Sequence, residues 1–278
     1  VSITAAPAIP TLSPNPACTN TATFTAGGAA WYEFFVNGTS QGPASATATL
    51  NAGAGFAAGT EVCVRSYPAP PVMDGALTEP AWGAEIAGTT GGALSSFGPN
   101  RIDGLKLLNR NGVLYGAVAG TEEDGSTDNL NNRIAFFIDC RAGGFNNLGA
   151  WTNRGGANSN TSGLTNLNNG IVFDAGFEAD YILTMNRFNG QTFYDLYDMV
   201  ANTNNYLGNG PSAQFGFQPN AVEGDLTKGF EFSFPLSALG NPTSAMKFFG
   251  MLINDPGGAT TFISNQFVTP AGPGEGSY

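Results

Sequence analysis

The 278-residue chain contains no histidine, and Asp, Glu, Lys and Arg together make up only 11% of it. The missing imidazole excludes Ser-His-Asp and Cys-His nucleophile pairs, imidazole acid–base catalysis and every metal site that needs a histidine ligand. Globular proteins usually carry about 25% charged residues. Uncharged Asn, Thr and Ser supply the missing polarity. Without histidine, the remaining possibilities are catalysis by carboxylates or no catalysis.

Positive charge is scarce as well. The chain has 10 Lys and Arg against 21 Asp and Glu, which gives a formal net charge of −11. Such a chain is repelled by a phosphate backbone, because affinity for nucleic acid rests on Lys and Arg. No Lys/Arg cluster marks an anionic membrane surface either. We therefore expect no nucleic acid partner.

Cysteine and long apolar runs are the remaining shortages. Three cysteines, at positions 18, 63 and 140, cannot make a zinc cluster. The run IAFFI at 134–138 is about the longest apolar one, far short of the ~20 residues that cross a bilayer. The chain begins with Val1 instead of Met, so we expect a processed chain. Low lysine content and a candidate cysteine pair favour an exported protein.

What the chain does have is enough apolar material for a core, with 42% hydrophobic residues and 21 Phe. Its composition breaks at residues 67–71, YPAPP, where closely spaced prolines predict an extended linker. We expect a Pro-spaced amino-terminal arm at 1–17, a small β-sandwich at 18–69, and a larger β-sandwich at 70–278 that ends in a Gly/Pro-rich tail. The fold class is therefore all-β.

Short β-prone runs fill the first unit, and Asn37-Gly38 is a strong hairpin signal. The segment FTAGGAAWYEFFVNG at 24–38 resembles the Ig-like and PKD-like repeats of large secreted Bacteroidota surface proteins, and GTEVCV at 59–64 fits their closing strand. This resemblance covers about 18–67. It implies a secreted, extracellular location at the cell surface of a bacterium, and a spacer or adhesive unit without enzymatic activity.

Cys18 and Cys63 flank Trp31 in the sequence. This order is similar to the immunoglobulin-like pattern, in which a disulfide joins the two sheets beside a buried Trp. The resemblance implies a Cys18–Cys63 disulfide, which would stabilise the fold by roughly 3–4 kcal/mol through loop entropy. Two unpaired core thiols are the alternative. Cys140 is expected to be a buried strand-end thiol, although an unpaired thiol in an exported protein can also bridge subunits.

The second unit is again rich in strand signals. Asn111-Gly112 and Asn189-Gly190 predict hairpin tips. Residues 134–139, 229–234 and 248–253 predict further strands. These signals favour an all-β sandwich of roughly 200 residues, a size that single domains of this class reach.

Three motifs in this unit carry a second resemblance. VMDGALTEPAW at 72–82 resembles the opening of family 9 carbohydrate-binding modules and related DOMON-like sandwiches. RIAFFID at 133–139 and FEFSFPL at 230–236 resemble two later strands of that family. The resemblance implies a DOMON-like, carbohydrate-binding-module-like sandwich, whose members often hold structural calcium and often occur as accessory domains.

The segment TEEDGSTDNLNN at 121–132 is the densest acidic stretch. Hard cations such as Ca²⁺ take six to eight oxygen ligands, which closely spaced carboxylates on a loop can supply. Glu122, Glu123, Asp124 and Asp128 are the candidate calcium ligands, and calcium is the one cofactor we expect. A solvated acidic hairpin tip is the alternative.

Glycan binding needs aromatic faces together with amide and carboxylate partners for the sugar hydroxyls. Trp151 is the best-placed aromatic residue, in a polar Gly/Asn stretch, and Tyr206 is next. Family 9 members typically hold sugar between two Trp. Only Trp31, Trp82 and Trp151 are present here, and we expect the first two to be structural, so this chain cannot form that sandwich from Trp alone. A packing role is the alternative for Trp151.

Carboxylates close in sequence, such as Asp195 and Asp198, do not by themselves indicate a glycosidase, and no other pattern suggests an enzyme. The first functional hypothesis is a non-catalytic extracellular structural or adhesive protein. It would self-assemble into a filament or surface layer through terminal arms. The arm residues are Ile9, Pro10, Leu12, Pro270 and Pro273. The alternative is a polysaccharide-binding protein that uses the second sandwich.

Overall fold

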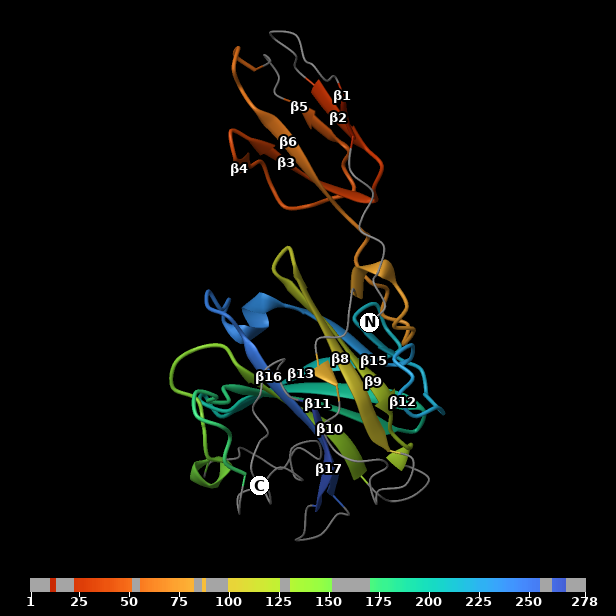
Figure 1. Cartoon of the computed structure of the whole chain (residues 1–278). Coiled ribbons are helices and arrows are strands. Elements are labelled where there is room, and N and C mark those ends of the chain that lie inside the picture. The colour runs from red at the N-terminus through yellow and green to blue at the C-terminus, as the bar shows by residue number, and fades with distance from the viewer. Residues whose placement is uncertain are drawn as a thin grey trace. The chain divides into compact units, whose positions relative to one another are not determined.

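The computed structural model describes residues 11–13, 23–51, 56–82, 87–88, 100–125, 131–151, 171–255 and 262–268. Antiparallel strands joined by turns and short 3₁₀ segments dominate these residues, which confirms the expected all-β class. The chain divides into two compact units (Figure 1). The first comprises Val1–Pro71 with Glu79–Ala84, and the second comprises Val72–Thr78 with Glu85–Tyr278.

The first unit contains two three-stranded sheets, ordered β1-β2-β5 and β4-β3-β6. Alternating side chains of these strands meet in a small core built on Ala26, Tyr32 and Phe34. The predicted hairpin is confirmed, because Asn37 and Gly38 take left-handed φ values between β3 and β4. The strands are β1 (Thr11–Ser13), β2 (Thr23–Gly27), β3 (Trp31–Val36), β4 (Thr39–Ser40), β5 (Thr49–Asn51) and β6 (Val62–Tyr67).

The cysteine geometry of this unit differs from the immunoglobulin pattern. Cys63 is exposed, and its thiol donates to Glu61 Oε1 at 3.4 Å. The neighbouring Val64 packs against the core instead, so strand alternation turns Cys63 outward. Trp31 is only half-buried. Cys18 lies outside the described residues, so its pairing with Cys63 stays a prediction.

Of the residues expected to form assembly arms, only Leu12 is described. It lies in β1, opposite Ala26 of β2, and packs against the core of the first unit. Its contacts are therefore made within its own chain. Ile9, Pro10, Pro270 and Pro273 lie outside the described residues.

The second unit contains a six-stranded sheet, ordered β13-β12-β11-β10-β16-β17, and a five-stranded sheet, ordered β14-β15-β9-β8-β7. The six-stranded sheet consists of β10 (Asn131–Asp139), β11 (Tyr181–Phe188), β12 (Gln191–Asp198), β13 (Thr203–Gly210), β16 (Lys247–Asp255) and β17 (Phe262–Val268). The five-stranded sheet consists of β7 (Ala87–Gly88), β8 (Arg101–Arg110), β9 (Val113–Thr121), β14 (Phe215–Phe217) and β15 (Gly229–Pro235).

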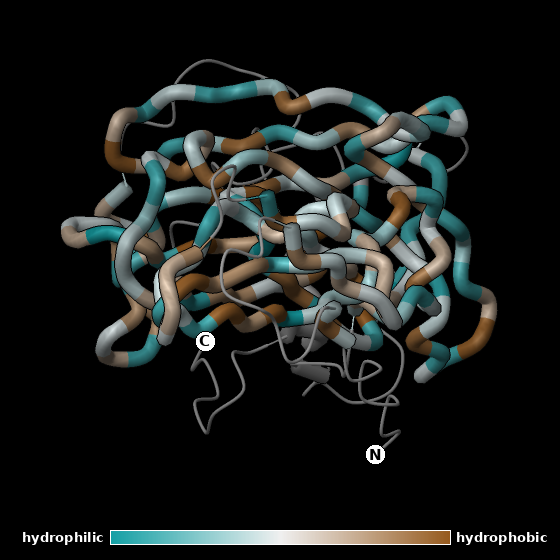
Figure 2. Tube along the Cα trace, turned by 90° about the horizontal axis from the view of Figure 1, so that it is seen from above, coloured by the Kyte–Doolittle hydropathy of each residue, from teal (hydrophilic) through white to brown (hydrophobic). Residues whose placement is uncertain are grey.

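Both predicted hairpins of this unit are confirmed. Asn111-Gly112 joins β8 to β9, and Asn189-Gly190 joins β11 to β12. All four residues have positive φ, as a two-residue turn between right-twisted strands requires. Figure 2 shows hydrophobic and hydrophilic positions following one another along the described trace.

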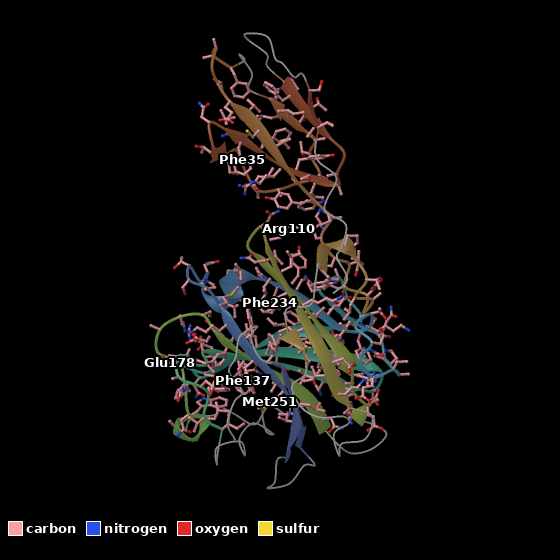
Figure 3. The ribbon with its side chains drawn as sticks, viewed as in Figure 1. Phe35, Arg110, Phe137, Glu178, Phe234 and Met251 are labelled. Atoms are coloured by element: carbon pink, nitrogen blue, oxygen red, sulfur yellow. The ribbon has the colours of Figure 1, made fainter. Side chains whose placement is uncertain are left out.

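The main core of the second unit brings together residues of both sheets. One alternating set of side chains, including Phe136 of β10 and Phe232 of β15, forms this core. The opposite set, including Phe137 and Met251, forms a second core with residues of the connection between β10 and β11. Phe137 and Met251 are labelled among the side chains of this unit in Figure 3. The six-stranded sheet is thus apolar on both faces at its centre.

A buried carboxylate forms hydrogen bonds between two of the sequence motifs, residues 230–236 and residues 72–82. Glu231, which is fully buried in β15, accepts hydrogen bonds from the backbone N–H groups of Asp74 (2.8 Å) and Gly75 (2.5 Å). Gly75 has φ +84°, and a Cβ there would lie 2.2 Å from the backbone nitrogen of Gln218. The turn at 74–75 therefore needs glycine for its conformation and Glu231 to satisfy its N–H groups.

Replacing Glu231 with Ala should destabilise the second unit by about 1–3 kcal/mol, because the Gly75 N–H loses its acceptor while the Asp74 N–H keeps Val72 O at 2.9 Å. A loss of this size lowers Tm by roughly 2–12 °C. Thermal unfolding by circular dichroism measures it. Glu223→Ala, at an exposed position, should stay within about 0.5 kcal/mol of wild type. Equal Tm values for both variants would contradict the role assigned to Glu231.

Candidate functional site

The second face of the six-stranded sheet is covered at one end by apolar side chains from the β10–β11 connection. Trp151 is one of them, with only 3% of its surface exposed. Its ring meets that of Tyr197 edge-on, with centroids 5.2 Å apart. Trp151 therefore has the packing role that the sequence allowed, and its buried ring is not accessible to a sugar. The other covering residues are Leu148, Ile171, Phe173 and Phe177.

Farther along the same face the sheet becomes polar. Thr184 of β11 lies opposite Asp195 of β12, and Asp195 lies opposite Tyr206 of β13. Asn204, also on β13, donates its side-chain amide to Asp195 Oδ1 at 3.1 Å. These four residues, Thr184, Asp195, Asn204 and Tyr206, are called the polar row below. Strand alternation places them on the face that Ile182 and Tyr197 occupy.

Exposure rises steeply along the polar row. Thr184 and Asp195 are each 1% exposed, Asn204 is half-buried, and Tyr206 is 52% exposed. Partial burial, followed by the nearby charge of Asp195, raises the pKa of the Tyr206 phenol. Within the described part of the chain, the buried Thr184 Oγ1 and Asn204 Oδ1 have no hydrogen-bond partner.

Chemically, the polar row offers a hydroxyl, a carboxylate, an amide and the face of an exposed phenol ring. Native proteins satisfy nearly all of their buried polar atoms. Both atoms are buried, so their free capacity suits a water molecule that can both donate and accept. The exposed ring of Tyr206 at the end of the row suits the apolar face of a sugar.

The residues expected to bind calcium are engaged with protein groups. Glu122 Oε1 accepts from the backbone N–H of Arg187 at 3.0 Å, and Glu123 Oε2 accepts from the Asn100 amide at 3.1 Å. Asp124 accepts from two backbone N–H groups at the β11–β12 turn. Asp128 lies outside the described residues. Where residues are described, no three His, Cys, Asp or Glu side chains gather as a metal site would need.

A second charged cluster lies where β10 ends and β11 begins. Asp180 is fully buried, and its Oδ2 accepts from the backbone N–H groups of Cys140 and Arg141, both at 2.8 Å. Arg141 donates to Tyr181 Oη at 2.7 Å and to Asp198 Oδ1 at 2.6 Å. The guanidinium also lies over the Tyr181 ring, 4.6 Å from its centroid. Asp180, and Asp198 through the Arg141 side chain, stabilise the backbone just after the end of β10.

Sequence reasoning named Tyr206 as a candidate glycan-binding residue and Asp195 only as one of a pair of carboxylates close in sequence, and it did not name Thr184 or Asn204. The informative signal is Asp195 itself, because a carboxylate in the strand FYDLY at 193–197 interrupts an otherwise apolar and aromatic run. Thr184 and Asn204 carry no comparable local signal. Only the pairing of β11, β12 and β13 brings them to Asp195.

Comparison with known proteins gives no assignment of this site: neither the protein-family models nor the curated protein sequences contain a match to the chain. Among the residues described, no helix is long and apolar enough to cross a membrane.

Cys140 should resist alkylation in the native protein. It is 3% exposed, and burial, aided by the charge of Asp180, raises the pKa of its thiol to about 12. The reactive thiolate is therefore scarce at neutral pH. Mass spectrometry after iodoacetamide treatment should find Cys140 unmodified in the native protein and modified in guanidinium. Labelling of Cys140 without denaturant would count against its burial. The non-reduced peptide map also tests the predicted Cys18–Cys63 bridge.

The ion pair of Asp198 should make stability depend on pH. Partial burial raises the pKa of Asp198, but hydrogen bonds from Arg141 and from backbone N–H groups outweigh it, and the net pKa lies below the ordinary 3.8. Its stabilisation is therefore complete above that value and is lost as the pH falls through the folded-state pKa. Asp198→Asn should cost up to about 1 kcal/mol at pH 7, and less in acid.

Urea unfolding of both proteins at several pH values measures this difference. Asp174→Asn, at an exposed carboxylate, controls for the general effect of removing a negative charge. A constant difference between wild type and Asp198→Asn down to the lowest pH would argue against the ion pair as its source.

Proposed function

We propose that the protein is a non-catalytic, extracellular adhesive protein whose larger sandwich binds a neutral polysaccharide at the polar row. The observation that carries the proposal is the exposed Tyr206 in register with the buried Asp195, beside Asn204. An aromatic face next to hydroxyl-binding groups is the usual chemistry of sugar recognition.

The negative charge of the protein favours a neutral ligand over an acidic one. The chain carries a net charge of −11, and the central group of the polar row is the carboxylate of Asp195. Both repel acidic polysaccharides. A neutral sugar can stack on the exposed Tyr206 ring without bringing a negative charge close to Asp195.

The arrangement of carboxylates supports binding without catalysis. Glycosidases usually need two carboxyl groups that flank the scissile bond. In the described structure, Asp180 and Glu231 are buried and hold backbone N–H groups, and Asp198 is paired with Arg141. Asp195 is the one carboxylate of the polar row.

Assembly through terminal arms remains a hypothesis of its own. Leu12 contacts its own chain, and the other arm residues lie outside the described part. An adhesive role for the larger sandwich, with the first unit as an Ig-like spacer, fits the expected surface location and does not require the arms to polymerise.

Isothermal titration with soluble xylan and cello-oligosaccharides tests the proposal. We expect heat and a change in intrinsic fluorescence for wild type. The affinity should fall at least tenfold in Tyr206→Ala, which removes the aromatic face. Tyr115→Ala, on the other sheet, is the matched control and should bind like wild type. A wild-type protein that binds no neutral polysaccharide would overturn the proposal.

A further inference from the structure

One face of the sheet β4-β3-β6 in the first unit is turned away from the core. Tyr32 and Phe34 of β3 point into the core, so strand alternation turns the odd-numbered residues of β3 to the opposite face. Three residues of β6 lie directly opposite them in the strand register. This surface is called the outer face below, and it consists of Trp31, Glu33 and Phe35 from β3 and of Cys63, Arg65 and Tyr67 from β6.

Aromatic side chains dominate the outer face. Trp31, Phe35 and Tyr67 are all half-buried, and none of them belongs to the core of the first unit. Figure 3 labels Phe35 in this unit. The other two tryptophans of the chain, Trp82 and Trp151, are each 3% exposed. Trp31 is therefore the most exposed of the three tryptophans, and it lies beside Tyr67, its partner in the register.

A carboxylate and a guanidinium lie among these rings. One oxygen of Glu33 accepts from Ser40 Oγ at 2.8 Å, and the other accepts from Tyr67 Oη at 2.6 Å. Arg65, directly opposite Glu33, is exposed. Its guanidinium lies over the Phe35 ring, 4.8 Å from the centroid. The outer face thus combines aromatic surface with one negative and one positive group.

The backbone of the outer face favours a polysaccharide over a peptide as the occupant. An extended peptide commonly binds at the edge of a sheet, where free N–H and C=O groups pair with its own backbone. The strand β3 is no such edge, because it pairs with β4 on one side and with β6 on the other. A sugar chain needs hydroxyl partners and apolar ring contacts instead, and the outer face supplies both.

Charge and length narrow the occupant further. The carboxylate of Glu33 and the guanidinium of Arg65 balance each other, so the outer face does not attract a strongly charged polymer. Sugar hydroxyls can donate to the carboxylate and accept from the guanidinium. Trp31 and Phe35 are four residues apart on one strand, a distance of about 13 Å. This distance is longer than a single sugar ring, so an extended chain fits the face better than a monosaccharide.

We propose that the outer face is a second site for a neutral polysaccharide, in which sugar rings stack on Trp31 and Tyr67 and sugar hydroxyls bind the charged pair beside them. The site is separate from the polar row, because the outer face belongs to the first unit and the polar row belongs to the second. The choice of ligand follows from the outer face alone. The first unit is then a binding module as well as a spacer.

Quenching of tryptophan fluorescence by acrylamide tests this site. Acrylamide is uncharged and is therefore not repelled by a chain of net charge −11. It should quench mainly Trp31, so Trp31→Phe should lose most of the quenching and thereby identify the signal. Saturating cello-oligosaccharides should bring the quenching of wild type close to that of Trp31→Phe. The same protection should appear in Tyr206→Ala, whose remaining, weaker binding belongs to the outer face.

Two variants in the Tyr206→Ala background test the hydrogen bonds. Arg65→Ala removes an exposed donor, so half-maximal protection of Trp31 should need about fivefold more oligosaccharide. Lys228→Ala removes a positive charge from an exposed position of the second unit and should leave the protection unchanged. Thermal melts establish that each variant is folded. In a parallel titration, gelatin, a soluble unfolded polypeptide, should give no protection.

The two sites can fail independently. Quenching of Trp31 that saturating oligosaccharide does not change would overturn the outer face as a site, even where titration shows heat that depends on Tyr206. Protection that Arg65→Ala does not weaken would overturn it as well. So would protection by gelatin, which would identify the outer face as a protein-binding surface. Protection of Trp31 in a protein whose affinity Tyr206→Ala leaves unchanged would support the outer face and count against the polar row.

Discussion

The architecture of the larger unit depends on β10, in which every residue from Asn132 through Asp139 is buried. Antiparallel sheets commonly leave one face exposed to solvent. The side chains of β10, however, must be covered by other residues on both faces of the sheet. The ring centroids of Phe136 and of Phe232 in the facing sheet are 6.3 Å apart, and those of Phe137 and of Phe173 in the β10–β11 connection are 5.1 Å apart. The polar row lies on the second face, beyond the apolar residues of this cover.

Carboxylates in this weakly charged chain serve mainly as acceptors for backbone N–H groups. Glu231 holds the turn at 74–75, Asp180 holds the start of the β10–β11 connection, and Asp124 holds the β11–β12 turn. A buried carboxylate that accepts such bonds stabilises a turn without needing a positive partner. Of the acidic residues that cluster in the sequence, Glu122 and Asp124 both accept from backbone N–H groups at the end of β11 and its turn, and Glu123 accepts from the Asn100 amide.

Local signals predicted local structure well. The three Asn-Gly hairpins depend on two residues each, and the apolar strand at 134–139 depends on a short run, so both were evident from the sequence. Trp151 was ambiguous because its neighbours are polar, while the residues that bury it are distant in the chain. The polar row was hidden for a related reason. Its members belong to three strands, and only the register of those strands makes them neighbours.

The pairing of β10 with β16 also sets the order of events during synthesis. Asp139 pairs with Lys247, which follows it by 247 − 139 = 108 residues. At about 5–20 residues per second, a ribosome needs roughly 5–20 s to cover that distance. During this interval β10, which is buried along almost its whole length, lacks at least one of its two neighbouring strands. Folding of the larger unit therefore cannot be completed until β16 has been synthesised, and nascent β10 is the segment a chaperone would have to shield.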